Sequence, residues 1–182
     1  MQIILQPVMA DIEHKILHEL ANDISKEFKN IKVNVGSSSI QPGREAGFQD
    51  AFDASRNQWN SPKLLQVLSE KFNPGKESKI LVIVDADAYS YGLNFVFGEA
   101  IGNGGIAVIY LPRIRQEFYG LNTNEQLFYQ RMVKESVHEL GPSFGLAHCN
   151  KTSCIMHFSN SLRDTDIKAR RFCDSCNCKW SK

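Results

Sequence analysis

A short run near position 140 has the side chains and the spacing of a metal site that activates water. From His138 to His148 the chain reads H-E-x-x-P-x-x-G-x-x-H. Imidazole nitrogens bind zinc at about 2.0–2.1 Å, and zinc makes a bound water acidic enough to lose its proton near neutral pH. In such a site His138 and His148 would be the ligands and Glu139 the base that accepts this proton, although a bare H-E pair with a histidine ten residues later also occurs by chance. Gly145 allows the turn that brings His148 back to the metal.

Position 142 departs from the simplest form of such a site. Two histidines in H-E-x-x-H lie on one face of a helix and bind the same metal. Here residue 142 is proline, so the second imidazole is missing. Proline also lacks an N–H, and inside a helix its ring crowds the carbonyl of His138 at a cost of about 3 kcal/mol. We therefore expect the helix to end or kink near Leu140, and Gly141 to leave helical geometry.

All five cysteines of the chain follow this run. Cys149 comes directly after His148, Cys154 lies five residues later, and Cys173 and Cys176 form a C-x-x-C pair. Where thiols stay reduced, such spacing indicates metal ligands rather than disulfides. The fifth thiol, Cys178, could replace Cys176 as a ligand, although the C-x-x-C spacing suits one metal better.

From Gly145 onward the pattern G-x-x-H-C-x4-C-x-M-x16-C-x-x-C resembles the archaemetzincins, a family of metzincin-like zinc metallopeptidases. The resemblance implies hydrolysis of peptide bonds with Glu139 as general base, and it makes Met156 the methionine of the Met-turn below the metal. It also implies a second, structural zinc site. The four ligands of that site would be Cys149, Cys154, Cys173 and Cys176.

Pro142 stands where the long signature of the resembled family has its second histidine. The catalytic zinc would then be held weakly or not at all, because even outer-shell losses weaken metal binding by about 10–100-fold. The alternative is a pseudopeptidase, which binds peptides and keeps only the structural zinc.

Composition limits the partners that we expect. The chain has 182 residues, 42% of them hydrophobic, and a formal net charge of +1, which suits one globular domain and does not favour nucleic-acid binding. Its start does not have the pattern of a signal peptide, and no apolar run approaches the roughly 20 residues of a membrane span. We expect a cytoplasmic monomer that acts on a peptide or protein substrate, with no nucleic acid and no membrane partner.

The elements that must position the site begin with a β-α-β unit, since an amphipathic helix separates two strand-like segments. A fourth helical segment follows the site. We predict helices over 11–29, 61–72, 123–140 and 161–172, and strands over 1–8, 31–35, 79–85, 93–97 and 105–110. Thr123 with Gln126 predicts a capping box at the start of the helix that carries His138. Periodicity assigns nothing firmly between Gly36 and Asn60.

Resemblance also supplies the expected architecture. The fold class is α/β (α+β), metzincin-like: a mixed twisted sheet with backing and active-site helices above a small, zinc-stapled C-terminal lobe. The lobes would be residues 1–145 and 146–182 of a single domain. In metzincins an edge strand beside the catalytic helix pairs with an extended substrate. This makes 92–100 the substrate edge, with Phe95, Val96 and Phe97 as its contact residues.

Other charged residues have plainer interpretations. His14 and His18 suit the surface of an amphipathic helix, because no third ligand lies nearby in the sequence. Asp85 and Asp87 follow a predicted strand, where turn residues are common. Glu135 lies one turn before the H-E pair and could support the site, but an exposed helix charge is the simpler expectation. The same holds for the basic group of Arg163, Lys168, Arg170 and Arg171.

Overall fold

The computed structural model describes residues 1–36, 39–41, 46–102 and 104–180, apart from the side chains of Ala46, Cys178 and Trp180. The α-helices are α1 (His14–Glu27), α2 (Ala46–Ala51), α3 (Ser61–Phe72), α4 (Glu125–Leu140), α5 (Leu162–Ile167) and α6 (Asp174–Trp180). The strands are β1 (Gln2–Val8), β2 (Lys32–Val35), β3 (Phe52–Asp53), β4 (Gln58–Asn60), β5 (Ser78–Val84), β6 (Ala88–Tyr89), β7 (Gly98–Ala100) and β8 (Ile106–Tyr110). Three 3-10 helices are η1 (Pro112–Ile114), η2 (Gln116–Tyr119) and η3 (Gly141–Phe144).

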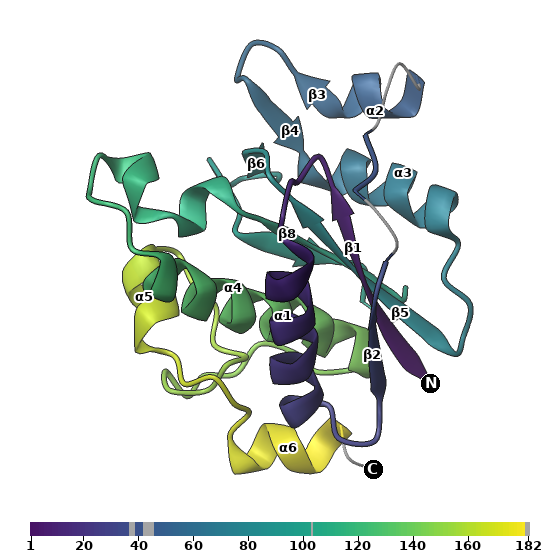
Figure 1. The fold of residues 1–182 in the computed structure, drawn as a ribbon, viewed down its shortest axis with the longest axis vertical. Helices are drawn as coiled ribbons and strands as arrows, with labels where there is room; N and C mark the ends of the chain where they lie inside the picture. Colours follow the sequence, from purple (N-terminus) through teal and green to yellow (C-terminus); the bar gives the residue numbers. More distant parts are fainter. Residues whose placement is uncertain (37–38, 42–45, 103, 181–182) are drawn as a thin grey trace.

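The main sheet of the described residues has the strand order β2-β1-β5-β8-β7. All neighbours are parallel except β7, which runs antiparallel to β8 at the edge. The predicted β-α-β unit is confirmed by β1, α1 and β2, because β1 pairs with β2 in parallel. This is the mixed α/β arrangement expected from the sequence, with helices on both faces of the sheet (Figure 1).

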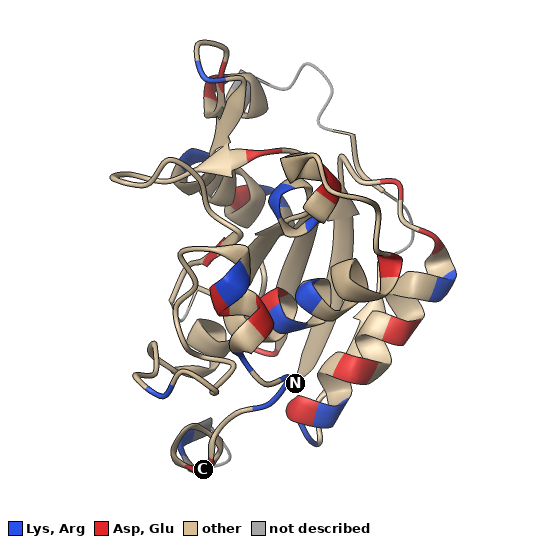
Figure 2. Ribbon diagram, turned by 90° about the vertical axis from the view of Figure 1, so that its left-hand side faces the viewer, with Lys and Arg blue, Asp and Glu red and all other residues tan. Residues whose placement is uncertain are grey.

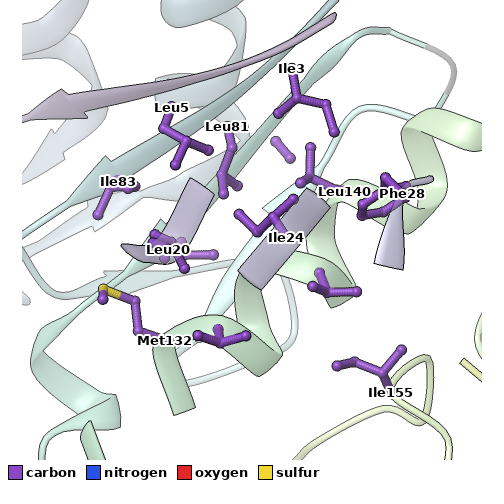
Figure 3. Close-up of a cluster of buried hydrophobic side chains, with 14 of the residues drawn as sticks. Ile3, Leu5, Leu20, Ile24, Phe28, Leu81, Ile83, Met132, Leu140 and Ile155 are labelled. Carbon is purple, nitrogen blue, oxygen red and sulfur yellow. The ribbon is translucent and has the colours of Figure 1, made fainter. Parts of the chain in front are cut away.

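Alternate residues of the buried strands supply the two faces of the sheet with apolar side chains. Leu81 and Ile83 belong to the cluster that α1 and α4 cover, whereas Val82 and Val84 belong to the cluster that α3 covers. Strands covered on both faces are expected to be apolar throughout, as β5 and β8 are. Figure 3 shows the first cluster, where side chains from β1, β5, α1 and α4 meet with Ile155 from the chain beyond α4.

Helix α4 is buried along its C-terminal half. Every residue from Arg131 to Leu140 is shielded from solvent, including six polar or charged ones. The helix lies against β8 and β7 on one side and has α1 and α5 as further neighbours. Because α4 is enclosed in this way, its last turn is held in a fixed position. This turn carries His138 and Glu139.

Several local predictions from the sequence are wrong. The strand predicted over 93–97 lies instead at Gly98–Ala100, within the predicted edge segment 92–100. The preceding residues cross between two sheets: the Val96 N–H donates to Ala88 at 3.0 Å, while the Phe97 carbonyl accepts from Tyr110 at 2.8 Å. The cap of α4 is Asn124, whose side chain accepts from the Leu127 N–H at 3.0 Å. The predicted helix over 161–172 ends at Ile167.

The segment that periodicity left unassigned forms α2, β3 and β4. Strands β3, β4 and β6 make a small second sheet beside α3. Lys and Arg residues are interspersed with Asp and Glu over the ribbon in Figure 2. No helix within the described ranges is both long and apolar enough to span a membrane.

Candidate active site and cysteine cluster

The last turn of α4 brings His138 against His148. Their rings are stacked with centroids 5.3 Å apart and an interplanar angle of 18°. His138 is 4% exposed, and its Nδ1 lies 2.8 Å from the carbonyl oxygen of Ile155. A carbonyl only accepts, so Nδ1 carries the hydrogen and Nε2 keeps its lone pair. Burial lowers the pKa of His138 to about 4, which keeps the ring neutral and able to bind a metal.

The chain turns after α4 as the sequence predicts, but by a different path. Helix α4 ends at Leu140, and η3 continues from Gly141 to Phe144. Gly141 keeps right-handed helical geometry, with φ −49° and ψ −50°, so its predicted departure from the helix is wrong. Pro142 is accepted because it lies in the first turn of η3, where no N–H is needed for an internal hydrogen bond. Gly145 then reverses the chain with φ +78°.

Met156 lies directly under this turn. A Cβ atom added to Gly141 would come within 2.4 Å of the Met156 sulfur, so the glycine is needed for this close approach. Met156 is fully buried, and its carbonyl accepts from the Cys149 N–H at 2.9 Å. The methionine therefore supports both the end of α4 and the start of the cysteine segment.

Glu139 lies beside the edge strand β7. A Cβ atom on Gly98 would meet the Cγ of Glu139 at 2.4 Å and the carbonyl oxygen of Val108 at 2.6 Å. Glu139 is 8% exposed, and no group among the described residues donates a hydrogen bond to its carboxyl. Burial raises the pKa of Glu139 well above its ordinary value, and the nearby carboxylate of Glu135 raises it further.

A cleft with a cavity volume of about 210 Å³ opens beside His138 and Glu139. The predicted substrate residues Phe95, Val96 and Phe97 form part of its wall. Val96 and Phe97 are largely buried, so the side chain with the most freedom to meet a ligand is Phe95. The other lining residues are Gly92, Leu93, Asn94, Gly98, Glu135, Phe158, Ser159 and Asn160.

Glu135 is not the exposed charge that the sequence suggested. It is 2% exposed and accepts from the Thr165 hydroxyl at 2.9 Å and from the Lys168 ammonium at 3.1 Å. Lys168 is also buried, at 2% exposure, and is not part of a solvated helix face. No local sequence signal marks this pair, because the two residues are 33 positions apart.

The remaining charged candidates lie away from the cleft. Asp85 forms an ion pair with Arg115, and Asp87 forms one with Arg113, each with two hydrogen bonds between the side chains. These aspartates therefore fix the chain after β5 to the segment after β8. His14 and His18 are exposed on α1.

Four cysteines lie together in the C-terminal part of the chain. Their sulfur atoms are all within 4.8 Å of one another. The Sγ atoms of Cys149 and Cys173 are 3.8 Å apart, as are those of Cys154 and Cys176. Zn–S bonds of about 2.3 Å in a tetrahedron place sulfurs about 3.8 Å apart, so the donor set fits zinc. A backbone hydrogen bond from Cys176 lowers the pKa of Cys173 to about 7, whereas burial raises the pKa of Cys154 and of Cys176, so a metal that binds here must displace protons from the buried thiols.

Comparison with known proteins agrees with this geometry. Residues 1–182 match Peptidase family M54. The chain belongs to this family. It is 38% identical over 173 residues to the archaemetzincin of Saccharolobus islandicus strain L.S.2.15, covering 95% of this chain and 90% of the relative. It is 37% identical over 174 residues to the archaemetzincin of Pyrococcus furiosus, covering 96% and 89%.

The chain is also similar to solved structures of an archaemetzincin and of a zinc-dependent peptidase. The archaemetzincin of Archaeoglobus fulgidus, complexed with malonate, superposes with a TM-score of 0.77 at 34% identity, covering 98% of this chain and 99% of that one. A zinc-dependent peptidase from Methanocorpusculum labreanum superposes with a TM-score of 0.84 at 28% identity, with the same coverage. The M54 chain is thus a zinc metallopeptidase by family, and zinc is its expected metal.

The cleft of this M54 chain fits a catalytic zinc less well than the cysteine cluster fits a structural one. The cysteines are the only group of three or more candidate donors that the described residues bring together. His138 and His148 are a pair without a third imidazole, since position 142 is proline. His157 does not complete the set: its Nδ1 lies 2.9 Å from the carbonyl oxygen of Cys149, and it belongs to no group of three candidate donors among the described residues. A closed set of three protein ligands is therefore not present in the cleft.

Proposed function

We propose that this protein binds an extended stretch of peptide in the cleft and hydrolyses it slowly. The observation that carries the proposal is the pairing of His138 and His148 beside an unpartnered Glu139, with Pro142 in place of a third ligand. In this family the chemistry that zinc supplies is a water made acidic enough to attack a peptide carbonyl. With two protein ligands instead of three, we expect the metal to be held weakly, so turnover is limited by its occupancy.

The residues of the chain have separate roles in this proposal. Strand β7 lies at an edge of the sheet, so its outer backbone groups can pair with an extended peptide. Phe95 offers an apolar contact in the cleft wall. Glu139 holds or accepts a proton next to the scissile bond, and its shielding from water strengthens its electrostatic effect there. His138 keeps Nε2 available because its other nitrogen donates to Ile155.

A second candidate function is a pseudopeptidase that binds peptides without cleaving them. Pro142 favours it, because the cleft then has too few ligands to keep a catalytic metal under ordinary zinc concentrations. Both candidates place the peptide in the same cleft and both keep the four-cysteine zinc. They differ only in hydrolysis.

The test measures binding and hydrolysis separately. A fluorogenic peptide library is incubated with the zinc-loaded protein, and affinity is followed by fluorescence anisotropy at a concentration where cleavage is negligible. The matched control is Glu139→Gln, which keeps the size and shape of the side chain but removes the base. We expect binding by both proteins, with slow cleavage by the unmodified protein alone. Equal cleavage rates would show that the cleavage comes from elsewhere, and no cleavage by either would favour the pseudopeptidase.

A further inference from the structure

At the floor of the cleft lies the carboxylate of Glu135, of which only one oxygen accepts hydrogen bonds from the protein. Glu135 is 2% exposed and lines the cleft, and both of its hydrogen bonds reach the same oxygen, Oε1. The donors are the Thr165 hydroxyl and the Lys168 ammonium. Within the described ranges no group donates to Oε2. The second oxygen of a buried carboxylate is therefore available to a ligand that enters the cleft.

Glu139 directs a second carboxyl into the same space. It follows Glu135 by four residues, so the two side chains lie on one face of α4. Glu139 is 8% exposed and also lacks a hydrogen-bond partner among the described residues. A buried carboxyl without a partner is costly, unless a ligand supplies the missing donor.

The walls of the cleft have a different character from its floor. Apolar side chains line much of them, beside Asn94, Ser159 and Asn160, and no lysine or arginine is among the lining residues that the structure describes. The apolar wall residues are Leu93, Phe95, Val96, Phe97 and Phe158. The charged groups that act on Glu139 are the carboxylates of Glu135 and Glu99 and the ammonium of Lys168. An apolar wall above an acidic floor suits a side chain with an aliphatic stem and a cationic end.

We propose that the cleft selects peptides that insert a lysine or arginine side chain, with the cationic end on Glu135 Oε2 and the stem along Phe95 and Phe158, while Glu139 keeps its role as the base. This inference rests on the proposed binding of peptides in the cleft and names the class of peptide. Glu135 is then a specificity residue, and the Lys168 partner holds it in place. An acidic side chain is disfavoured, because it would meet two carboxyls, whereas the nearby cations Lys168 and Arg113 already pair with Glu135 and Asp87.

The first test changes only the ligand. Four fluorescent peptides, acetylated and amidated at their ends, differ at one central position: lysine, acetyl-lysine, norleucine or glutamate. Their affinities for the unmodified protein are measured by anisotropy. We expect lysine to bind about tenfold more tightly than acetyl-lysine and norleucine, as a charge-assisted hydrogen bond would provide, and glutamate to bind most weakly. Equal or tighter binding of norleucine would overturn the inference, since the cleft would then select only for apolar character.

The second test changes the floor. Glu135→Gln alone would leave Lys168 buried and unpaired, so the variant to use is Glu135→Gln with Lys168→Met, in which the amide oxygen can still accept from Thr165. We expect the preference for lysine over norleucine to fall to about twofold or less. The matched control is Glu70→Gln on α3, on the other face of the sheet, which should keep the tenfold preference.

The outcomes separate this inference from the proposed function. Binding of all four peptides with equal affinity overturns the selection of cationic side chains and leaves peptide binding intact. Failure of every peptide to bind overturns both. A double variant that folds and still prefers lysine tenfold would show that Glu135 does not select the cationic side chain. If the double variant does not fold, the comparison of lysine with acetyl-lysine on the unmodified protein still decides the matter.

Discussion

His138 has its two ring nitrogens directed to different tasks. Nδ1 donates to the carbonyl of Ile155 at 2.8 Å, and Nε2 is left for a ligand. The carbonyl thus fixes both the tautomer and the orientation of the ring, as outer partners of metal-binding histidines commonly do. Ile155 is held in turn by its own N–H, which donates to the Arg171 carbonyl at 3.2 Å. At the scale of single residues the site is prepared for a metal at His138, and what it lacks is a ligand at position 142.

Replacing Pro142 with histidine is therefore expected to add a second zinc and to raise peptide hydrolysis strongly. Histidine at 142 would lie four residues after His138, which places the new imidazole on the same side of the chain. A missing ligand costs more than the 10–100-fold in metal affinity that outer-shell losses typically cost, so the gain in affinity should exceed about 100-fold. The measurements are zinc stoichiometry and cleavage of a fluorogenic peptide.

The control for this experiment is Pro142→Ala, which also removes the proline ring but adds no ligand. It should gain neither metal nor activity. If the histidine variant behaves like the alanine variant, then the defect is not confined to position 142, and the pseudopeptidase becomes the better description of the cleft.

Helix α4 depends on two neighbours that approach it unusually closely. Strand β7 contacts it through Gly98, where there is no room for a Cβ atom. Helix α5 contacts it through charged groups: Arg131 pairs with Asp166 at 2.7 Å, and Lys134 donates to the carbonyls of Thr165 and Asp166. At the scale of elements, the position of the cleft is set by a small residue on one side and by an ion pair and charged hydrogen bonds on the other.

Gly98→Ala should destabilise the protein by about 1–3 kcal/mol and weaken peptide binding. The new methyl group would overlap with Glu139 and with the backbone oxygen of Val108, and the backbone cannot move aside without distorting the pairing of β7 with β8. Chemical denaturation measures the loss. Gly75→Ala, at a position where a Cβ atom would meet nothing within 4 Å, should change stability much less.

Lys168→Met should cost about 3–5 kcal/mol, because Glu135 would keep a buried charge without its cation. Adding Glu135→Gln to the same chain should recover a large part of that loss, since the pair is then replaced by neutral groups. The free energies of unfolding of the two variants give the comparison. If the double variant were less stable than Lys168→Met alone, the ion pair would not be the source of the effect.

The sequence predicted those parts of the molecule whose evidence is local. The β-α-β unit follows from periodicity, and the H-E pair, Gly145 and the cysteines follow from spacing along one stretch of chain. The prediction for Glu135 is wrong because its partners, Thr165 and Lys168, lie 30 and 33 residues away. They lie in and directly after α5, a helix that is shorter than the sequence predicts. The strand predicted over 93–97 is wrong because Val96 and Phe97 form hydrogen bonds with two different strands, β6 and β8. No alternation of apolar and polar residues in the sequence indicates this crossing.

On the scale of the whole molecule, the cysteine cluster fastens the end of the chain to the cleft. Cys149 follows His148, and Cys154 precedes Ile155, whose carbonyl orients His138. Phe172, next to Cys173, packs edge-on against Phe28 at the end of α1, with ring centroids 5.5 Å apart. His148 and the carbonyl that orients His138 therefore both lie in the segment of chain that carries the four thiols.

The purified protein should carry about one tightly bound zinc per chain, and removing it should lower stability and weaken peptide binding together. Elemental analysis gives the stoichiometry, and thermal unfolding with and without a strong chelator gives the change in stability. Cys154→Ser should reproduce the effect of the chelator. A zinc content near zero after expression in zinc-rich medium would contradict the four-cysteine site.

The pairing of β1 with β5 also determines when the protein can fold. Strand β1 begins at residue 2, yet its neighbour β5 begins 76 residues later, as the hydrogen bond from Gln2 to Ser78 shows. During synthesis the first strand must wait for its central partner while the ribosome adds that length of chain. Contacts so distant in sequence are expected to make folding slow, because the chain must close a long loop before any pairing energy is gained. His138, His148 and the cysteines are made after the strands of this sheet, so the cleft is completed only after the sheet that supports it.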